Sequence, residues 1–169
     1  LVPGDLQQCA DSAIRLRAEF LRERGGEISF HATSGDPMPW SRWQAGERPY
    51  DAGNKVRWRP GTDRDTWEGY LGQVFTWAGS FSVEHHETVK DDDPHPGDVL
   101  VQGGFPGHAI LLMDVAREGD TFYFLAGQSF MPAQSFHLDL GPHQGWWRFE
   151  DEMDLGSWFF FRDDLRDWK

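Results

Sequence analysis

One stretch of the sequence, residues 108–116, restricts the possible folds more than any other because it is almost entirely apolar. A run of this length, bounded by turn residues, is typical of a strand covered on both faces. Residues 117–120 (REGD) then form a hairpin turn, and residues 121–126 have the pattern of the returning strand. The chain is therefore expected to build a sheet around a buried antiparallel hairpin.

Two segments with helical periodicity precede this hairpin. Residues 5–24 carry an apolar stripe at helical spacing, and Asp5 with Gln8 has the spacing of a capping box. Residues 65–78 carry a second stripe, at the i, i+3, i+4, i+7, i+8 and i+11 positions. Helices followed by consecutive antiparallel strands predict an α+β fold.

Shorter segments complete the expected architecture. A strand is predicted over residues 28–32, and a long irregular loop, of a kind that is often functional, over residues 33–63. The remaining predicted elements are a helical turn at 83–89 and strands at 98–102, 136–140 and 158–162.

Length and charge exclude several classes of protein. The 169 residues suit a single domain over 1–169, and the start at Leu1 leaves open that this is the C-terminal part of a longer chain. A net charge of −12 disfavours a duplex nucleic-acid partner, which needs a basic surface. No apolar run approaches the roughly 20 residues of a membrane-spanning helix.

Cys9 is the best candidate for a catalytic nucleophile. A cysteine attacks as the thiolate, and the N-terminal end of a helix favours that form because its free N–H groups carry partial positive charge. The alternative is a small buried side chain, since Cys9 also lies beside the apolar stripe of its helix. As the one cysteine of the chain, it forms no internal disulfide.

His108 is the candidate base, because it opens the central strand after a glycine-rich segment, residues 103–107. A sheet fixes the first residue of a strand yet leaves it open at one end, which suits a general base. Gly107 permits close approach of a ligand to the backbone. The alternative is a histidine whose hydrogen bonds are satisfied at the strand edge.

Hairpin geometry supplies a third polar residue. If Ala116 and Asp120 flank the turn symmetrically, paired positions add up to 236 and Gln128 faces His108. A hydrogen bond from Gln128 would fix the imidazole tautomer, as the third member of a catalytic triad does. A register slip would bring in Ser129 instead. Otherwise Gln128 only satisfies backbone groups at a strand end.

Blocks spread over nearly the whole chain resemble a bacterial family labelled domain of unknown function 4846. The residues that carry this resemblance are 6–11 (LQQCAD), 15–19 (RLRAE), 33–35 (TSG), 74–79 (VFTWAG), 97–109, and 128–134 (QSFMPAQ). The last two of these ranges supply Gly107, Ser129 and Gln134, which together with Gln8 are substrate-binding candidates. The family label carries no activity.

The order of these motifs is also similar to NlpC-like cell-wall peptidases and papain-like amidases. In those enzymes a cysteine at a helix start precedes a Gly-His strand and a polar residue on the next strand, which here are Cys9, His108 and Gln128. The resemblance implies a papain-like arrangement and a cysteine hydrolase that cleaves an amide bond in peptidoglycan peptides. It implies a periplasmic or extracellular location and no cofactor.

Two other kinds of site compete with this interpretation. The richest group of metal-ligand residue types is Glu84 to Glu87 with His95, but its spacing matches no zinc motif, and we expect no metal there. The other alternative is a non-catalytic ligand-binding or glycan-binding domain. Trp40 and Trp43 in the long loop would then stack on a ligand, but packing of these side chains onto the core is the favoured alternative.

Overall fold

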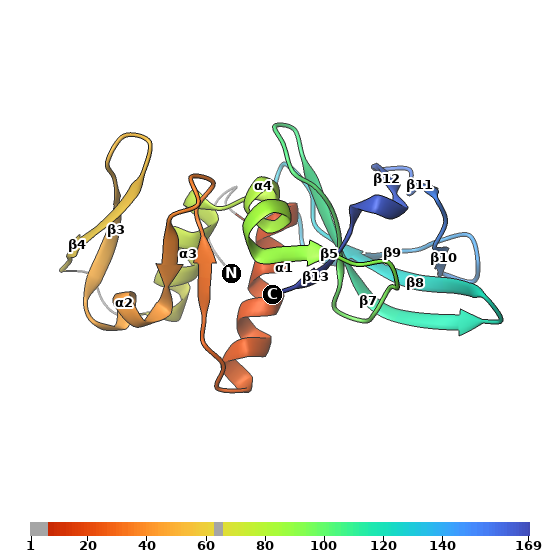
Figure 1. The fold of residues 1–169 in the computed structure, drawn as a ribbon, viewed down its shortest axis with the longest axis horizontal. Helices are drawn as coiled ribbons and strands as arrows, with labels where there is room; N and C mark the ends of the chain where they lie inside the picture. Colours follow the sequence, from red (N-terminus) through yellow and green to blue (C-terminus); the bar gives the residue numbers. More distant parts are fainter. Residues whose placement is uncertain (1–6, 63–65) are drawn as a thin grey trace.

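The computed structural model describes residues 7–62 and 66–169, and it shows a mixed α+β fold built on one large antiparallel sheet (Figure 1). The central hairpin pairs β7 (His108–Glu118) with β8 (Thr121–Gln128), as the apolar run predicts. The sheet has the order β10-β8-β7-β6-β13-β5, and β9 also pairs with β8. The other strands of this sheet are β5 (Thr88–Lys90), β6 (Val99–Gln102), β9 (His137–Asp139), β10 (Trp147–Arg148) and β13 (Leu165–Trp168).

Helix α1 (Cys9–Glu23) lies against one face of this sheet, and α3 (Trp67–Trp77) lies on the same side of the sheet and belongs to the same core cluster (Figure 1). The smaller helices are α2 (Trp40–Gln44), α4 (Ser80–Ser82), the π-helix η1 (Val83–Glu87) and the 3-10 turn η2 (Arg162–Asp164). Within the described residues, no helix is long and apolar enough to span a membrane.

Alternation along the strands divides the core into two clusters, one on each face of the sheet. Ala109 and Leu111 pack with α1 and α3, whereas Ile110 and Leu112 pack with Phe160 on the opposite face. Successive side chains of a strand point to opposite faces, so a strand covered on both sides needs apolar residues at every position. This explains why the first half of β7 is an unbroken apolar run.

Helix α1 begins at Cys9, later than the sequence pattern suggests, and Asp5 lies outside the described residues. The backbone N–H of Gln8 donates to Asp11 Oδ2 at 2.9 Å, so the acidic partner of the cap follows Gln8 instead of preceding it. Gly25 ends the helix with a φ of 67°, a conformation that favours glycine. Cys9 is therefore the first helical residue, which places its thiol at the N-terminal end of α1.

The prediction of an irregular loop over residues 33–63 is wrong. That segment contains α2, the strand β2 (Pro37–Pro39), which pairs with the preceding β1 (Ser29–His31), and a hairpin of β3 (Glu47–Asp51) with β4 (Val56–Pro60). A five-residue helix and three- to five-residue strands rich in Pro are too short to show a period. The β3–β4 hairpin lies at the end of the molecule farthest from β8 and β10 (Figure 1).

The predicted strand at 158–162 is in part correct, but it does not extend the main sheet. It contains β12 (Phe159–Phe161), which pairs only with β11 (Glu152–Asp154) in a separate two-stranded sheet. The main sheet is extended by β13 instead, which inserts between β6 and β5. The strand β13 (sequence LRDW) has no apolar alternation strong enough to reveal it.

The predicted hairpin register is also wrong. Glu118 pairs with Thr121, so the turn has two residues, and a bulge between Leu112 and Asp114 then shifts the pairing by one. The last pair of the ladder is Leu111 with Gly127, and His108 pairs only with Gln102 of β6. The start of β7 thus extends beyond its ladder with β8 and leaves space for side chains at this end of the sheet.

Candidate functional site

His108 and Gln128 are in direct contact despite the shifted register. Nε2 of His108 lies 2.8 Å from Oε1 of Gln128, and both side chains are buried. The long Gln128 side chain reaches along the strand direction and makes up for the two-residue offset. The sequence therefore points to the correct pair of residues through an incorrect register.

The orientation of the Gln128 amide is fixed by its other partners. Its Nε2 donates to Asp139 Oδ2 at 3.0 Å and to Ser157 Oγ at 3.2 Å. A carboxylate oxygen only accepts, so the amide must present its oxygen to His108. The hydrogen on the neutral imidazole consequently sits on Nε2, and the lone pair of Nδ1 is left to accept a proton.

Aromatic rings enclose the imidazole of His108. The ring centroids of Phe130, Trp158 and Phe160 lie 4.9, 5.2 and 6.1 Å from its own. Burial lowers the pKa of His108 below 6.5, while the hydrogen bond to Gln128 and the charge of Asp139 act in the opposite direction. Because burial is the larger effect, the imidazole is neutral at pH 7, the form that a general base requires.

Cys9, the first residue of α1, lies against the backbone at the start of β7. The backbone N–H groups of Ala10 and Ala109 face its thiol and favour the thiolate. Burial nevertheless raises the pKa of Cys9 above its ordinary value of 9.0, and the charge of Asp11 adds to this effect. The thiolate expected from the position at the helix terminus is therefore not the resting form, because loss of solvent outweighs the nearby N–H groups.

The thiol of Cys9 lies close to the backbone that follows His108, because the N–H of Ala109 faces it. Within residues 7–62 and 66–169, no hydrogen bond joins the two side chains. The Ala109 side chain faces the α1 cluster, whereas the His108 ring packs with Phe160 of the other cluster. Both groups are thus neutral at rest and are not preassembled as an ion pair, and His108 is not among the residues that line the pocket of Cys9.

Cys9 opens into a pocket of about 490 Å³. The walls come from the start of α1, the end of α3, and the glycine-rich segment before His108. Asp11 is the one charged side chain among them. The lining residues are Gln8, Cys9, Ala10, Asp11, Phe75, Ala78, Gly79, Ser80, Gly104, Phe105, Pro106, Gly107 and Met131. The pocket is therefore mainly apolar beside the thiol.

Among the substrate-binding candidates, Gln8 and Gly107 line this pocket, as do Phe105 and Met131, which the sequence did not single out. Met131 belongs to the family-like block 128–134, and that block was the available signal. Gln134 is exposed in the connection between β8 and β9 and does not line the pocket.

Ser129 requires a correction as a substrate-binding candidate. Its side chain is fully buried, lies 2.6 Å from Ser12 Oγ, and donates to the backbone oxygen of Gln8 at 3.0 Å. These bonds join the end of β8 to the first turn of α1 and hold Cys9 near the sheet. Ser129 therefore positions the helix and is closed to a ligand.

Trp40 and Trp43 also require a correction, because neither forms an exposed platform. Trp43 is 4% exposed in the core, and Trp40 packs against the rings of Trp67 and Tyr70 at 5.2 and 5.1 Å. Their large apolar area attaches the segment with α2 to α3. This packing removes the observation that favoured a binding module built on the loop aromatics.

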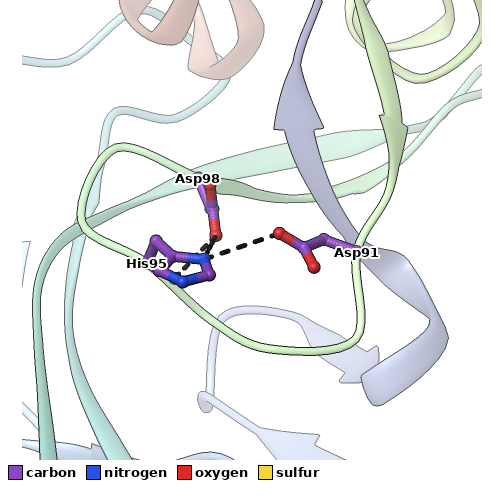
Figure 2. A group of neighbouring side chains, drawn as sticks. All are labelled: Asp91, His95 and Asp98. Carbon is purple, nitrogen blue, oxygen red and sulfur yellow. Dashed lines mark hydrogen bonds and ion pairs between the residues drawn. The ribbon is translucent and has the colours of Figure 1, made fainter.

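The histidine and acidic side chains that lie close together in the sequence do not form one group in the structure. Glu84 binds Arg166 at 3.1 Å and Glu87 binds His31 at 3.1 Å, so the two acids serve separate ion pairs. His95 lies instead with Asp91 and Asp98 in the turn between β5 and β6 (Figure 2).

In this turn, Nδ1 of His95 is 3.6 Å from Asp91 Oδ2 and 3.7 Å from Asp98 Oδ2. Burial raises the pKa of Asp98 to about 6, and the charges of Asp167 and Asp91 add to the effect. Two carboxylates and one imidazole are a donor set that suits a divalent cation. The backbone N–H of His95 also donates to Asp98 Oδ2 at 2.7 Å, so the turn itself brings these residues together.

Comparison with known proteins identifies a family and no individual relative. The family described as domain of unknown function (4846) matches residues 1–167, which is nearly the whole chain. No curated protein and no solved structure matches the chain. The chemistry of the site must therefore be argued from its own geometry.

Proposed function

The chain belongs to the family described as domain of unknown function (4846), and we propose that it is a cysteine hydrolase that cleaves an amide bond. Cys9 is the nucleophile, His108 the base, and Gln128 the residue that orients the base. The observation that carries the proposal is the bond from His108 Nε2 to Gln128 Oε1, because it leaves the lone pair of Nδ1 as the proton acceptor of this imidazole.

The reaction follows from the protonation states of the resting site. Nδ1 of His108 takes the thiol proton of Cys9, and the resulting thiolate attacks the carbonyl carbon of the substrate. The backbone N–H groups at the start of α1 stabilise the oxyanion. The C–N bond breaks as His108 returns the proton to the leaving amine. Water then gives a proton to His108, its oxygen attacks the thioester, and a carboxylic acid and the Cys9 thiol are released.

Two features support this proposal over a buried, structural cysteine. The thiol lines a pocket of about 490 Å³, whereas a structural cysteine has no need of an opening. The imidazole of His108 is held in one tautomer by two consecutive hydrogen bonds, which packing alone does not require. The arrangement of helix, strand and polar third residue is the papain-like arrangement that we propose for this fold.

The substrate that we propose is a peptide of the kind that cross-links peptidoglycan. The pocket beside Cys9 is mostly apolar and holds one acidic side chain, Asp11, and no basic one among its described lining residues. It suits an amide whose neighbouring groups are small and apolar and whose nearby charge is an amine. A substrate with a carboxylate beside the cleaved bond would be repelled.

The test is hydrolysis of a mixture of soluble muropeptides, followed by mass spectrometry. Wild-type protein should cleave an amide bond, and both Cys9→Ala and His108→Asn should lose at least about a hundredfold in rate, as expected for removal of a nucleophile or a base. His143→Asn is the matched control, because His143 lies in another pocket, and it should keep the wild-type rate. Cleavage that survives in folded Cys9→Ala would contradict the proposal.

A further inference from the structure

Asp139 is hydrogen-bonded to the candidate site, but it has no role in the proposed catalytic steps. It is the last residue of β9 and pairs with Ala126 of β8, so the main sheet holds its backbone. Its backbone oxygen accepts a hydrogen bond from Trp147 Nε1 at 2.8 Å, which adds a second anchor. The side chain is left to face Gln128.

We propose that Asp139 is a positioning residue that sets the tautomer and basicity of His108 through the amide of Gln128. This inference rests on the proposed function. The structure shows two consecutive hydrogen bonds, from Gln128 Nε2 to Asp139 Oδ2 at 3.0 Å and from His108 Nε2 to Gln128 Oε1 at 2.8 Å. Asp139 acts on the base through Gln128 and has no contact with the substrate.

The chemistry of the amide explains why a glutamine needs this support. Rotation of the Gln128 amide by 180° would exchange its oxygen and nitrogen at almost no cost in shape. The nitrogen would then face His108 Nε2, which would have to accept, and the proton would move to Nδ1. In that tautomer the one lone pair of the ring is on Nε2, where the Gln128 N–H occupies it, so the ring cannot act as the base. Asp139 prevents the rotation because a carboxylate cannot donate a hydrogen bond.

Ser157 is the other partner of this amide nitrogen and cannot replace Asp139. Its hydroxyl lies 3.2 Å from Gln128 Nε2, but a hydroxyl donates as readily as it accepts, so it tolerates either orientation of the amide. The directional constraint therefore comes from the carboxylate. Ser157 gives a natural comparison for experiments, since its removal keeps the charge of Asp139.

The charge of Asp139 and its hydrogen bond to Gln128 both favour His108 as a base. Burial raises the pKa of Asp139, and the two titratable groups that act on it, His137 and His108, oppose this effect in part. In return, the charge of Asp139 raises the pKa of His108 and so stabilises the imidazolium that forms when the thiol proton is transferred. Loss of the carboxylate should weaken the base and change its tautomer together.

The experiment measures the imidazole directly. We would record the ¹⁵N chemical shifts of His108 during a pH titration of Cys9→Ala protein, with and without Asp139→Asn. The starting protein should show one neutral tautomer, with the hydrogen on Nε2. Asp139→Asn, which keeps the shape of the side chain, should show a mixture of tautomers and a titration midpoint at lower pH. Asp114→Asn, an exposed aspartate on β7, is the control and should change neither.

Kinetics give a second reading of the same inference. Asp139→Asn should lower kcat by about tenfold or more with KM within about twofold, and its acid limb should move to lower pH. Ser157→Ala should keep the position of that limb. An unchanged tautomer and midpoint in folded Asp139→Asn would overturn the inference. Absence of hydrolysis by the wild type would overturn the proposed function alone, because the titration reads the inactive Cys9→Ala protein.

Discussion

Replacement of Asp11 by Asn should make the protein markedly less sensitive to high pH. The carboxyl of Asp11 is 6% exposed in the first turn of α1, and burial raises its pKa to about 7 from an ordinary value of 3.8. The folded chain therefore holds the proton more tightly than the unfolded chain does. Stability from this source is complete below about pH 4 and is lost as the pH rises towards 7 and beyond.

The magnitude follows from the two pKa values. A difference of about three pH units corresponds to about 4 kcal/mol between the acid and alkaline limits. Roughly 2 to 3 kcal/mol of this should be lost between pH 5 and pH 8, since part of the loss occurs below pH 5. Asp11→Asn keeps an acceptor for the Gln8 N–H and removes the titration.

Urea unfolding at several pH values between 5 and 8 measures this effect. The free energy of unfolding of Asp11→Asn minus that of the wild type should rise by about 2 to 3 kcal/mol across the range. Other titrating groups, such as Asp98 and His108, act in both proteins and cancel in the difference. Asp120→Asn, a fully exposed control, should give a flat difference. A flat difference for Asp11→Asn as well would refute the reasoning.

Three further results are expected, each from a single contact or from burial. Gly107→Ala should destabilise the fold by about 1 to 3 kcal/mol in urea unfolding, because its Cβ would lie 2.3 Å from Ser80 Oγ; full stability would contradict this tight packing. Phe160→Ala should cost about 3 to 5 kcal/mol by the same method, since the ring is fully buried beside His108, and a cost below about 1 kcal/mol would disagree with that burial. Alkylation of Cys9 by iodoacetamide should be slower than that of a free thiol at pH 7 and faster in Asp11→Asn, because burial and the Asp11 charge both raise the thiol pKa; a fast reaction at pH 6 would contradict the neutral resting pair.

The parts of the fold that the sequence predicts are those with a long period. The apolar run of β7 and the stripes of α1 and α3 extend over enough residues to distinguish a helix from a strand. The elements between residues 28 and 62 contain five residues or fewer, and their form depends on packing against α3. Tertiary contacts decide such segments, so local patterns do not reveal them.

The candidate site, too, is predictable from the sequence only in part. The closeness of His108 and Gln128 is accessible from the sequence because both belong to one hairpin, although the bulge near Met113 makes the register unpredictable. Asp139 is not accessible, since its place depends on how β9 returns to β8. The raised pKa of Cys9 is likewise hidden, because desolvation depends on the complete packing around the first turn of α1.

The central claim is that Cys9 attacks a carbonyl group with His108 as its base, and covalent trapping tests it most directly. The protein would be mixed with an activated ester, such as p-nitrophenyl acetate, quenched with acid within seconds, and analysed by intact mass and peptide mapping. The account predicts one acetyl group on Cys9 in the wild type and almost none in His108→Asn at pH 7. Equal acetylation of Cys9 in both proteins, or none in the wild type, would contradict it.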